Sequence, residues 1–568
     1  MAIGLIGWGR FLNVNQGRVT VPPGLWTYLH SIAAEIGQSF DFLQTPPPSL
    51  CQGGAGPGDD GYGVFWLRQL DGTRYGSCED LLAMIAALNT HGVQTLLDLV
   101  LHQMVGENGG PGVFKYPGAD NKTMNGAGST KPSWFRGSPN PPWAQNDTVP
   151  GGPLDPGFGR PRSYQHSQES LDDAIAFVKW LTHLTDATGY RFDDVKGSYP
   201  PAVREIMNAV PQCSFYSEFF DNRWNMGTWA TNSPMNSRSA VEDFDLHWHL
   251  QAACNGYDAR QFVAGGAGYW QMNPGLSVGF VDNPDTDTTP GQQVIFNKAI
   301  AYAILMSLPL AKTLVYGKDY FPSSVWPGSY GLKRLIDNLC WINRKFAFGT
   351  CEIPYVDQDV LIITRGGDGG SMGWSGGMVT VVNFNTLTER SFWAPTPCGP
   401  NRLLHDYTGH LPDVWTNADG WANFTVHSNA YSSGTSYGIY APAGVGDAHP
   451  TQRRQTTQVF VGDPTLRIMP VKNGRQVLPQ RIYCQKDTDL RLHLQFDRTG
   501  NSGQATVQME AAGPKDVLEV LSLSGPPSSA IAVAKVNTTG WHTISLIGAL
   551  LPASGINFTL TVTYTGAV

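Results

Sequence analysis

The sequence predicts an α/β fold in which a barrel of parallel strands and helices is followed by antiparallel β modules. Three observations lead to this fold class. Four nearly continuous apolar runs end in polar residues and are separated by helical patterns. From about residue 372, alternating segments and turns replace the helices, and alternation resumes after residue 454. Such apolar runs are typical of parallel strands buried on both faces, and a (β/α) barrel gathers polar strand ends at one face.

Segment 189–197 carries the strongest indication of chemistry. It is a short apolar strand that ends by presenting Arg191, Asp193 and Lys196 together. An arginine beside a carboxylate keeps that carboxylate ionised, as a nucleophile or an electrostatic stabiliser requires. Alone, this run could equally be a structural ion pair that closes a strand. It is accompanied by three more apolar runs that end in polar residues: 96–103, 215–218 and 278–285.

The first elements follow the strand–helix order of a barrel. Ser77 and Asp80 form a capping box, the following apolar positions have helical spacing, and Gly92 is the expected C-terminal cap. The predicted strands of this part are 4–8, 39–43 and 93–101.

A long segment then interrupts the pattern. Residues 104–165 are rich in Gly, Pro, Asn and Ser and show no long periodicity. Loops of this length inside compact domains are usually functional. A helical pattern resumes at 171–184, and 241–246 and 313–316 are predicted as the sixth and eighth strands.

The remainder of the chain predicts β structure. Alternating strands are expected at 378–383, 421–426 and 437–440, and a change of composition at 444–454 indicates a linker. The alternation of 455–568 predicts a β-sandwich. Such appended modules often bind carbohydrate, and a purely stabilising role is equally compatible with the pattern.

Composition restricts the partners. The net charge of −8, with only 15% charged residues, provides no basic surface for nucleic acid or anionic membranes. The most apolar run, 299–311, is too short to span a bilayer. The eight cysteines include no CxxC pair, so buried thiols are expected, with a Cys340–Cys351 disulfide left open.

The four strand-end segments, in this order, resemble the signature regions of the alpha-amylase family of glycoside hydrolases, most closely its plant and archaeal types. The resemblance covers about residues 4 to 444. It implies a (β/α)8 TIM barrel with an inserted domain B, an antiparallel domain C, and a C-terminal β-sandwich. The implied ranges are 1–103 and 166–370 for the barrel, 104–165 for domain B, 371–447 for domain C and 455–568 for the sandwich.

The resemblance also implies the roles of the acids. Asp193 corresponds to the nucleophile, Glu218 to the general acid/base, and Asp285 to the third acid that binds sugar hydroxyls. Opening an acetal requires a proton donor and a carboxylate below the oxocarbenium ion, which this pair supplies. Arg191 is expected to hold Asp193 ionised, with Asp98 as its support. Glu218 needs a pKa raised by burial and like charge.

Further contacts follow from the same likeness. Tyr62 matches the tyrosine that stacks on the sugar, although a core tyrosine is the alternative, and Lys196 resembles a contact to the leaving sugar. Gln103 and Pro284 stand where the family usually has sugar-binding histidines, which indicates altered specificity or a reduced rate. The remaining implied substrate and metal residues are Asn283 and Gly197, the latter through its backbone carbonyl. His102 replaces the usual calcium-ligating asparagine, which puts a calcium ion in doubt.

The function expected from this likeness is retaining hydrolysis of α-1,4-glucosidic bonds in starch-like glucans or maltooligosaccharides. The alternatives are an α-glucan transglycosylase of the same fold and a carbohydrate-binding protein with a decayed active site. Retention of all three acids argues against the decayed site. We expect a monomer without organic cofactor. No signal peptide is visible, so the secreted or cell-surface location that the family implies stands beside a cytoplasmic one.

Overall fold

The fold is described from a computed structural model. It covers residues 2–9, 24–51, 60–104, 116–117, 124–125, 160–161, 168–321, 329–371, 376–430 and 434–445. In the C-terminal part it covers 453–461, 476–484, 487–496, 506–512, 517–524, 529–537, 540–549 and 558–567.

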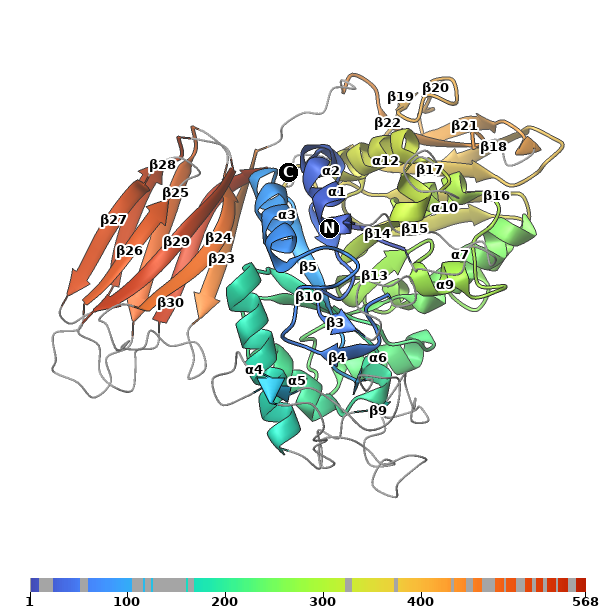
Figure 1. Ribbon diagram of the computed structural model, residues 1–568. Helices are drawn as coiled ribbons and strands as arrows, with labels where there is room; N and C mark the ends of the chain where they lie inside the picture. The colour runs from blue at the N-terminus through green and yellow to red at the C-terminus, as the bar shows by residue number, and fades with distance from the viewer. Residues whose placement is uncertain are drawn as a thin grey trace. The chain divides into compact units, whose positions relative to one another are not determined.

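Eight parallel strands form a closed barrel (Figure 1). Each barrel strand pairs with the barrel strand that follows it along the chain, and the last pairs with the first. Their side chains are almost all buried, which explains the continuous apolar runs. The barrel strands are β1 (Ala2–Ile6), β2 (Phe42–Gln44), β5 (Gln94–Leu99), β10 (Gly189–Phe192), β11 (Ser214–Ser217), β12 (Ala240–Glu242), β13 (Ser277–Phe280) and β14 (Lys312–Tyr316). The predicted TIM barrel is confirmed.

Helices alternate with these strands along the chain. Ser77 and Asp80 exchange the two bonds of the predicted capping box, at 3.0 and 3.1 Å, and Gly92 has the positive φ of a C-terminal cap, 80°. The helices are α1 (Leu25–Ser31), α2 (Ala33–Ser39), α3 (Cys78–Thr90), α4 (Gln168–Thr185), α5 (Pro200–Asn208), α6 (Arg223–Thr231), α7 (Phe244–Gly256), α8 (Arg260–Val263), α9 (Pro284–Thr288), α10 (Lys298–Leu305), α11 (Gly317–Tyr320) and α12 (Lys333–Phe346).

Four strand predictions are wrong in their bounds. The predicted strand 4–8 is Ala2–Ile6, and the predicted strand 93–101 is Gln94–Leu99. Residue 39 ends α2, and the second strand starts only at Phe42. The predicted strand 241–246 stops at Glu242, because the Asp243 side chain accepts a hydrogen bond from the N–H of Leu246 and caps α7. This early stop places Glu242, like the other acids, at a strand's carboxyl end.

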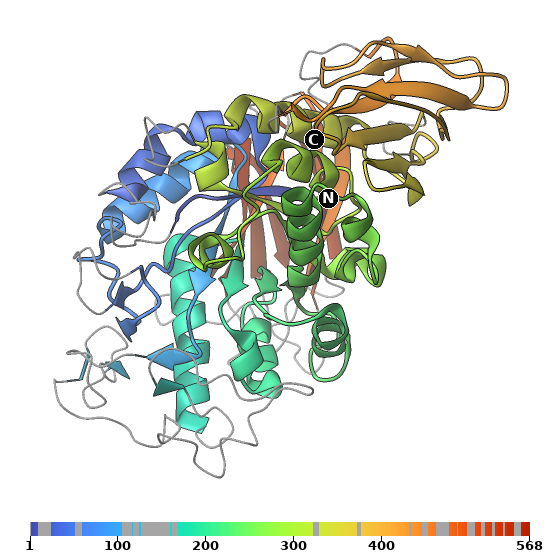
Figure 2. The same cartoon turned by 90° about the vertical axis from the view of Figure 1, so that its right-hand side faces the viewer.

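An antiparallel module follows the barrel, drawn in yellow to orange in Figure 2. Its six-stranded sheet contains β15 (Cys351–Val356), β16 (Val360–Arg365), β17 (Met378–Asn383), β22 (Tyr437–Pro442), β19 (Leu403–Asp406) and β20 (Val414–Trp415), and β18 (Arg390–Pro395) pairs with β21 (Trp421–Val426). The sheet therefore begins before the predicted start of domain C at residue 371.

The C-terminal part has two four-stranded antiparallel sheets, as the sandwich prediction requires. One contains β23 (Arg453–Val461), β30 (Phe558–Ala567), β25 (Asp489–Phe496) and β28 (Ser529–Lys535). The other contains β24 (Gln476–Cys484), β29 (Gly540–Ala549), β26 (Thr506–Ala512) and β27 (Val517–Ser524). Carbohydrate binding by this part stays a prediction.

Most of predicted domain B lies outside the described residues. The described pieces from the loops around the barrel are β3 (Leu50–Cys51), β4 (Val64–Trp66), β6 (Gln103–Met104), β7 (Tyr116–Pro117), β8 (Met124–Asn125) and β9 (Arg160–Pro161). Cys340 and Cys351 are both free thiols, so the disulfide left open between them is absent. Among the helices of the described residues, none has the length and apolar character to cross a bilayer.

Candidate active site

Arg191 is the centre of the site. It lies on β10 and is almost fully buried. Its Nη1 donates to Asp193 at 2.7 Å, and its Nη2 contacts Oε2 of Glu218 at 2.9 Å. The same Nη1 lies 3.1 Å from both oxygens of Asp98, and Nε donates to Glu242 at 3.2 Å. One guanidinium therefore joins the carboxyl ends of four barrel strands.

Asp193 follows directly after β10 and is buried. Its Oδ1 is held by Arg191, and Oδ2 lies 3.5 Å from the amide nitrogen of Gln103. Burial raises the pKa of Asp193 to about 7, although the positive charge of Arg191 lowers it. The sequence predicted the ion pair correctly, but burial keeps the pKa higher than an ion pair alone implies.

Glu218 follows directly after β11 and is half-buried. Its Oε2 accepts from Arg191 and, at 3.1 Å, from the backbone N–H of Asp194. Burial raises the pKa of Glu218 well above its usual value, although the positive charge of Arg191 lowers it. The negative charges of Asp193 and Asp285 raise the pKa further. Its raised pKa, which a general acid requires, agrees with the prediction.

Asp285 lies in the first turn of the short helix α9. Its negative charge raises the pKa of both Asp193 and Glu218, so the three acids lie in one electrostatic field. Asn283 accepts from the N–H groups of Asp285 and Thr286, at 3.0 and 2.9 Å, as the N-cap. Asn283 has the extended backbone expected before Pro284, with φ −133° and ψ 177°. The side-chain oxygen of Asn283 is therefore already engaged in capping α9. The contact of Asn283 with a sugar stays a prediction.

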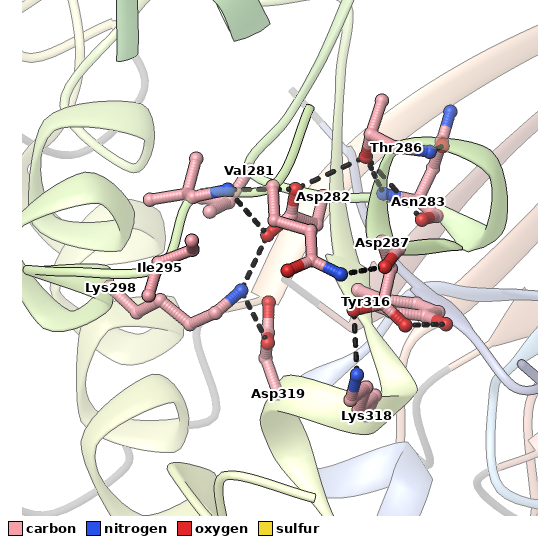
Figure 3. Close-up of polar contacts among 12 residues, drawn as sticks. Val281, Asp282, Asn283, Thr286, Asp287, Ile295, Lys298, Tyr316, Lys318 and Asp319 are labelled. Carbon is pink, nitrogen blue, oxygen red and sulfur yellow. Dashed lines mark hydrogen bonds and ion pairs between the residues drawn. The ribbon is translucent and has the colours of Figure 1, made fainter. Parts of the chain in front are cut away.

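A buried ionic network holds both ends of α9 (Figure 3). Before the helix, Asp282 binds Lys298 of α10, which also contacts Asp319 at 2.8 Å. Inside the helix, Asp287 pairs with Lys318 of α11 at 2.7 Å. Because removing one member of a buried pair leaves an uncompensated charge, such a network fixes the backbone that carries it. The sequence analysis did not identify these residues.

Tyr62 lies beside the acids and is half-buried. Its hydroxyl donates to Asp98 at 2.6 Å, its ring lies 5.6 Å from the Trp8 ring, and the Arg191 guanidinium carbon is 6.0 Å from its centroid. Asp98 thus accepts hydrogen bonds from both Arg191 and Tyr62. The contact with Arg191 was predicted. Stacking of Tyr62 on a sugar stays a prediction.

A calcium ligand at the Gly197 backbone carbonyl stays a prediction, because most of predicted domain B lies outside the described residues. Calcium takes oxygen ligands, whereas His102 presents an imidazole whose Nδ1 lies 3.0 Å from the side-chain oxygen of Gln103 and 2.9 Å from Asp194. Asp194 also accepts from the N–H of Gly197 at 3.3 Å. Within the described residues, no group of three or more His, Cys, Asp or Glu could hold a metal.

Lys196 contacts the segment that follows β11. Its Nζ donates to the backbone oxygen of Phe220 at 3.1 Å and pairs with Asp221 at 3.2 Å. Phe220 is 45% exposed and Trp224 is 61% exposed, so exposed aromatic side chains lie in the segment that this lysine contacts and at the start of α6. This surface agrees with the expected contact to a leaving sugar, which stays a prediction.

Sequence reasoning missed Glu242 and Asp194. Glu242 ends an apolar strand at an acid, which is the signal that identified the other carboxyls, but 241–246 was interpreted as one continuous strand. Asp194 has φ 40° and ψ 58°, a conformation uncommon outside glycine, and nothing in its sequence context indicated this. The site thus combines one arginine with a cluster of strand-end carboxyls.

This fold and site belong to the class of (β/α)8-barrel proteins with a carboxyl-rich site at the strand ends. The family model described as Alpha-amylase C-terminal matches residues 390–435. Alpha-amylase of Geobacillus stearothermophilus is 26% identical over 284 residues, 46% of this chain and 49% of that protein. Glucan 1,4-alpha-maltohexaosidase of Bacillus sp. (strain 707) is 25% identical over 268 residues, 44% of this chain and 50% of that protein.

Solved structures share the fold. The alpha-amylase of Geobacillus thermoleovorans, complexed with acarbose, superposes with a TM-score of 0.56 at 15% identity, over 78% of this chain and 97% of that one. The gamma-CGTase of alkalophilic Bacillus clarkii superposes with a TM-score of 0.54 at 15% identity, over 94% of this chain and 76% of that one. The chain spans about half the length of the curated relatives that it matches. The comparisons confirm the resemblance to the alpha-amylase family.

Proposed function

We propose that the protein is a retaining glycoside hydrolase that cleaves α-1,4-glucosidic bonds in starch-like glucans or maltooligosaccharides. The single observation that carries this proposal is the joint contact of Arg191 with Asp193 and Glu218, at 2.7 and 2.9 Å. A nucleophile and an acid on one guanidinium must be close neighbours, which is compatible with the carboxyl separation of about 5 Å in retaining enzymes.

The first half-reaction forms a covalent intermediate. An oxygen of Asp193 attacks the anomeric carbon, while Glu218 gives its proton to the glycosidic oxygen and the leaving sugar departs. The raised pKa of Glu218 supplies the protonated acid that this step needs. Asp193 has to be ionised, and the 2.7 Å contact with Arg191 stabilises its carboxylate.

The second half-reaction reverses the roles. Glu218, now ionised, takes a proton from water, and the water oxygen attacks the anomeric carbon and releases Asp193. The N–H of Asp194 and the Arg191 guanidinium both bind Oε2 of Glu218, so they hold the carboxylate in place for this step. Two inversions at the anomeric carbon retain the α configuration.

The proposed activity is tested by analysing the products. The protein is incubated separately with starch, maltooligosaccharides, pullulan and sucrose, and the products are separated by chromatography. Shorter maltooligosaccharides from starch support hydrolysis of α-1,4 bonds. Products longer than a defined maltooligosaccharide substrate would instead favour the transglycosylase, and binding of starch without any product would favour a decayed site. Asp193→Asn is the matched control that separates this activity from a contaminant.

A further inference from the structure

Glu242 is a buried carboxyl that the proposed mechanism does not use. It is the last residue of β12, and its side chain is only 4% exposed. Oε1 accepts from Nε of Arg191 at 3.2 Å. Among the described residues, Oε2 has no hydrogen-bond partner, although it is buried. A buried group with one oxygen committed to Arg191 and the other without a partner needs an explanation.

The Nε contact restricts how Arg191 can orient. A guanidinium is planar, so a partner at Nε fixes the direction in which the two terminal nitrogens point. Those nitrogens are the ones that contact Asp193 and Glu218. Without an acceptor at Nε, the guanidinium could turn toward Asp98, which already binds Nη1 through both oxygens.

We propose that Glu242 is a positioning residue for glycoside cleavage, because its Oε1 holds the Nε edge of Arg191 and so keeps the terminal nitrogens on Asp193 and Glu218. The catalytic part of this inference rests on the proposed function. Its geometric part concerns only the orientation of Arg191 and can be decided without turnover.

The ionisable groups that face Glu242 come from three strands. They are Arg191 of β10, Asp98 of β5, Tyr216 of β11, and Glu218 at the end of β11. Burial raises the pKa of Glu242 to about 8. The positive charge of Arg191 lowers this pKa, and the negative charge of Glu218 raises it. A carboxyl accepts through Oε1 in its ionised form and through its carbonyl oxygen in its neutral form. Its role is that of an acceptor, which glutamine can reproduce and leucine cannot.

The kinetic test compares Glu242→Gln with Glu242→Leu on a maltooligosaccharide. The glutamine variant should stay within about threefold of wild type, since it keeps an acceptor for Nε. The leucine variant should lose about 100-fold in kcat with a nearly unchanged KM, the scale of a small misplacement in an active site. Glu205→Leu, at an exposed position of α5, is the matched control and should leave kcat unchanged.

The pH profile gives a readout that a merely structural role does not move. Arg191 lowers the pKa of Asp193 and of Glu218. If Arg191 turns away in Glu242→Leu, both pKa values rise, and both limbs of the profile of kcat/KM shift to higher pH. Wild-type kinetics in Glu242→Leu, or equal losses in the leucine and glutamine variants, would overturn the proposal. If the leucine variant does not fold, Glu242→Met replaces it with the same expectations.

Crystal structures of wild type and the two variants separate this inference from the proposed function. The contact between Arg191 and Asp193 should persist in Glu242→Gln and be lost in Glu242→Leu. Retention of that contact in Glu242→Leu would overturn the positioning role. A wild-type protein inactive on every α-glucan would defeat the proposed function instead, and the crystallographic comparison would still decide the geometry.

Discussion

The backbone N–H of Asp194 donates a hydrogen bond to Oε2 of Glu218 across 3.1 Å. The residue that follows the proposed nucleophile thus binds the proposed acid directly. Asp194 reaches this position through a left-handed backbone, and its side chain contacts His102 and accepts from Gly197. The turn after β10 therefore sets the relative position of the two carboxyl groups that the proposed mechanism uses.

Replacing the proposed acid should separate the two half-reactions. Glu218→Ala should lose at least about 100-fold in kcat, since general acid–base catalysis contributes about 10²–10⁴-fold. Azide should restore turnover of an activated glucosyl fluoride and yield the glycosyl azide with retained configuration, because azide needs no general base. The measurement is NMR of the azide product. Near-normal starch hydrolysis by the variant without azide would mean that Glu218 is structural.

The pH dependence follows from the raised pKa values. Asp193 must be ionised to attack, and burial raises its pKa to about 7. The profile of kcat/KM should therefore fall on the acid side with a limb near pH 7, while protonated Glu218 sets the alkaline limb. The groups interact, so the limbs report values of the cluster. An acid limb at the ordinary pKa of an aspartate, about 4, would contradict this electrostatic description.

The buried ion pair between Lys318 and Asp287, which lies in the same helix as Asp285, should contribute strongly to stability. Lys318→Met leaves Asp287 buried without its cation and should cost about 3–5 kcal/mol in the free energy of unfolding. Lys333→Met removes the same charge from a pair that is 29% and 23% exposed, and should cost less than about 1 kcal/mol. Urea denaturation measures both. Equal costs would show that the network does not hold α9.

Restoring the missing histidines should alter specificity instead of simply raising the rate. Pro284 occupies the first turn of α9, where its fixed φ is favourable, and Asp285 follows it directly. Pro284→His should therefore disturb Asp285 and change the pattern of maltooligosaccharide products, alone or together with Gln103→His. Chromatography of starch digests measures this. A large and uniform gain on starch in the double variant would show that the native site is a weakened amylase.

Much of the site could be predicted because strand-end acids leave a local signal. An apolar run that stops at a carboxyl identified Asp193 and Glu218, and a capping box identified the start of α3. The same signal at Glu242 was lost because Asp243 ends the strand by capping α7 through a side-chain bond that the sequence pattern does not reveal.

The remaining features depend on contacts distant in sequence. Lys318 meets Asp287 and Lys298 meets Asp282 only after the barrel closes, so no local pattern indicates these pairs. The six-stranded antiparallel sheet likewise includes β15 and β16, which precede the predicted start of domain C at residue 371. In β15, all six residues lie at half-buried or exposed positions on an edge strand without a clean alternation.

The role of Asp193 as the nucleophile can be tested by trapping the intermediate. The protein is treated with 5-fluoro-α-D-glucosyl fluoride, digested with pepsin, and analysed by mass spectrometry, with Asp193→Asn as the control. A retaining mechanism predicts one fluoroglucosyl group on Asp193 and none on the control protein. A label on another carboxyl, or products released with inverted configuration, would contradict the assignment of Asp193.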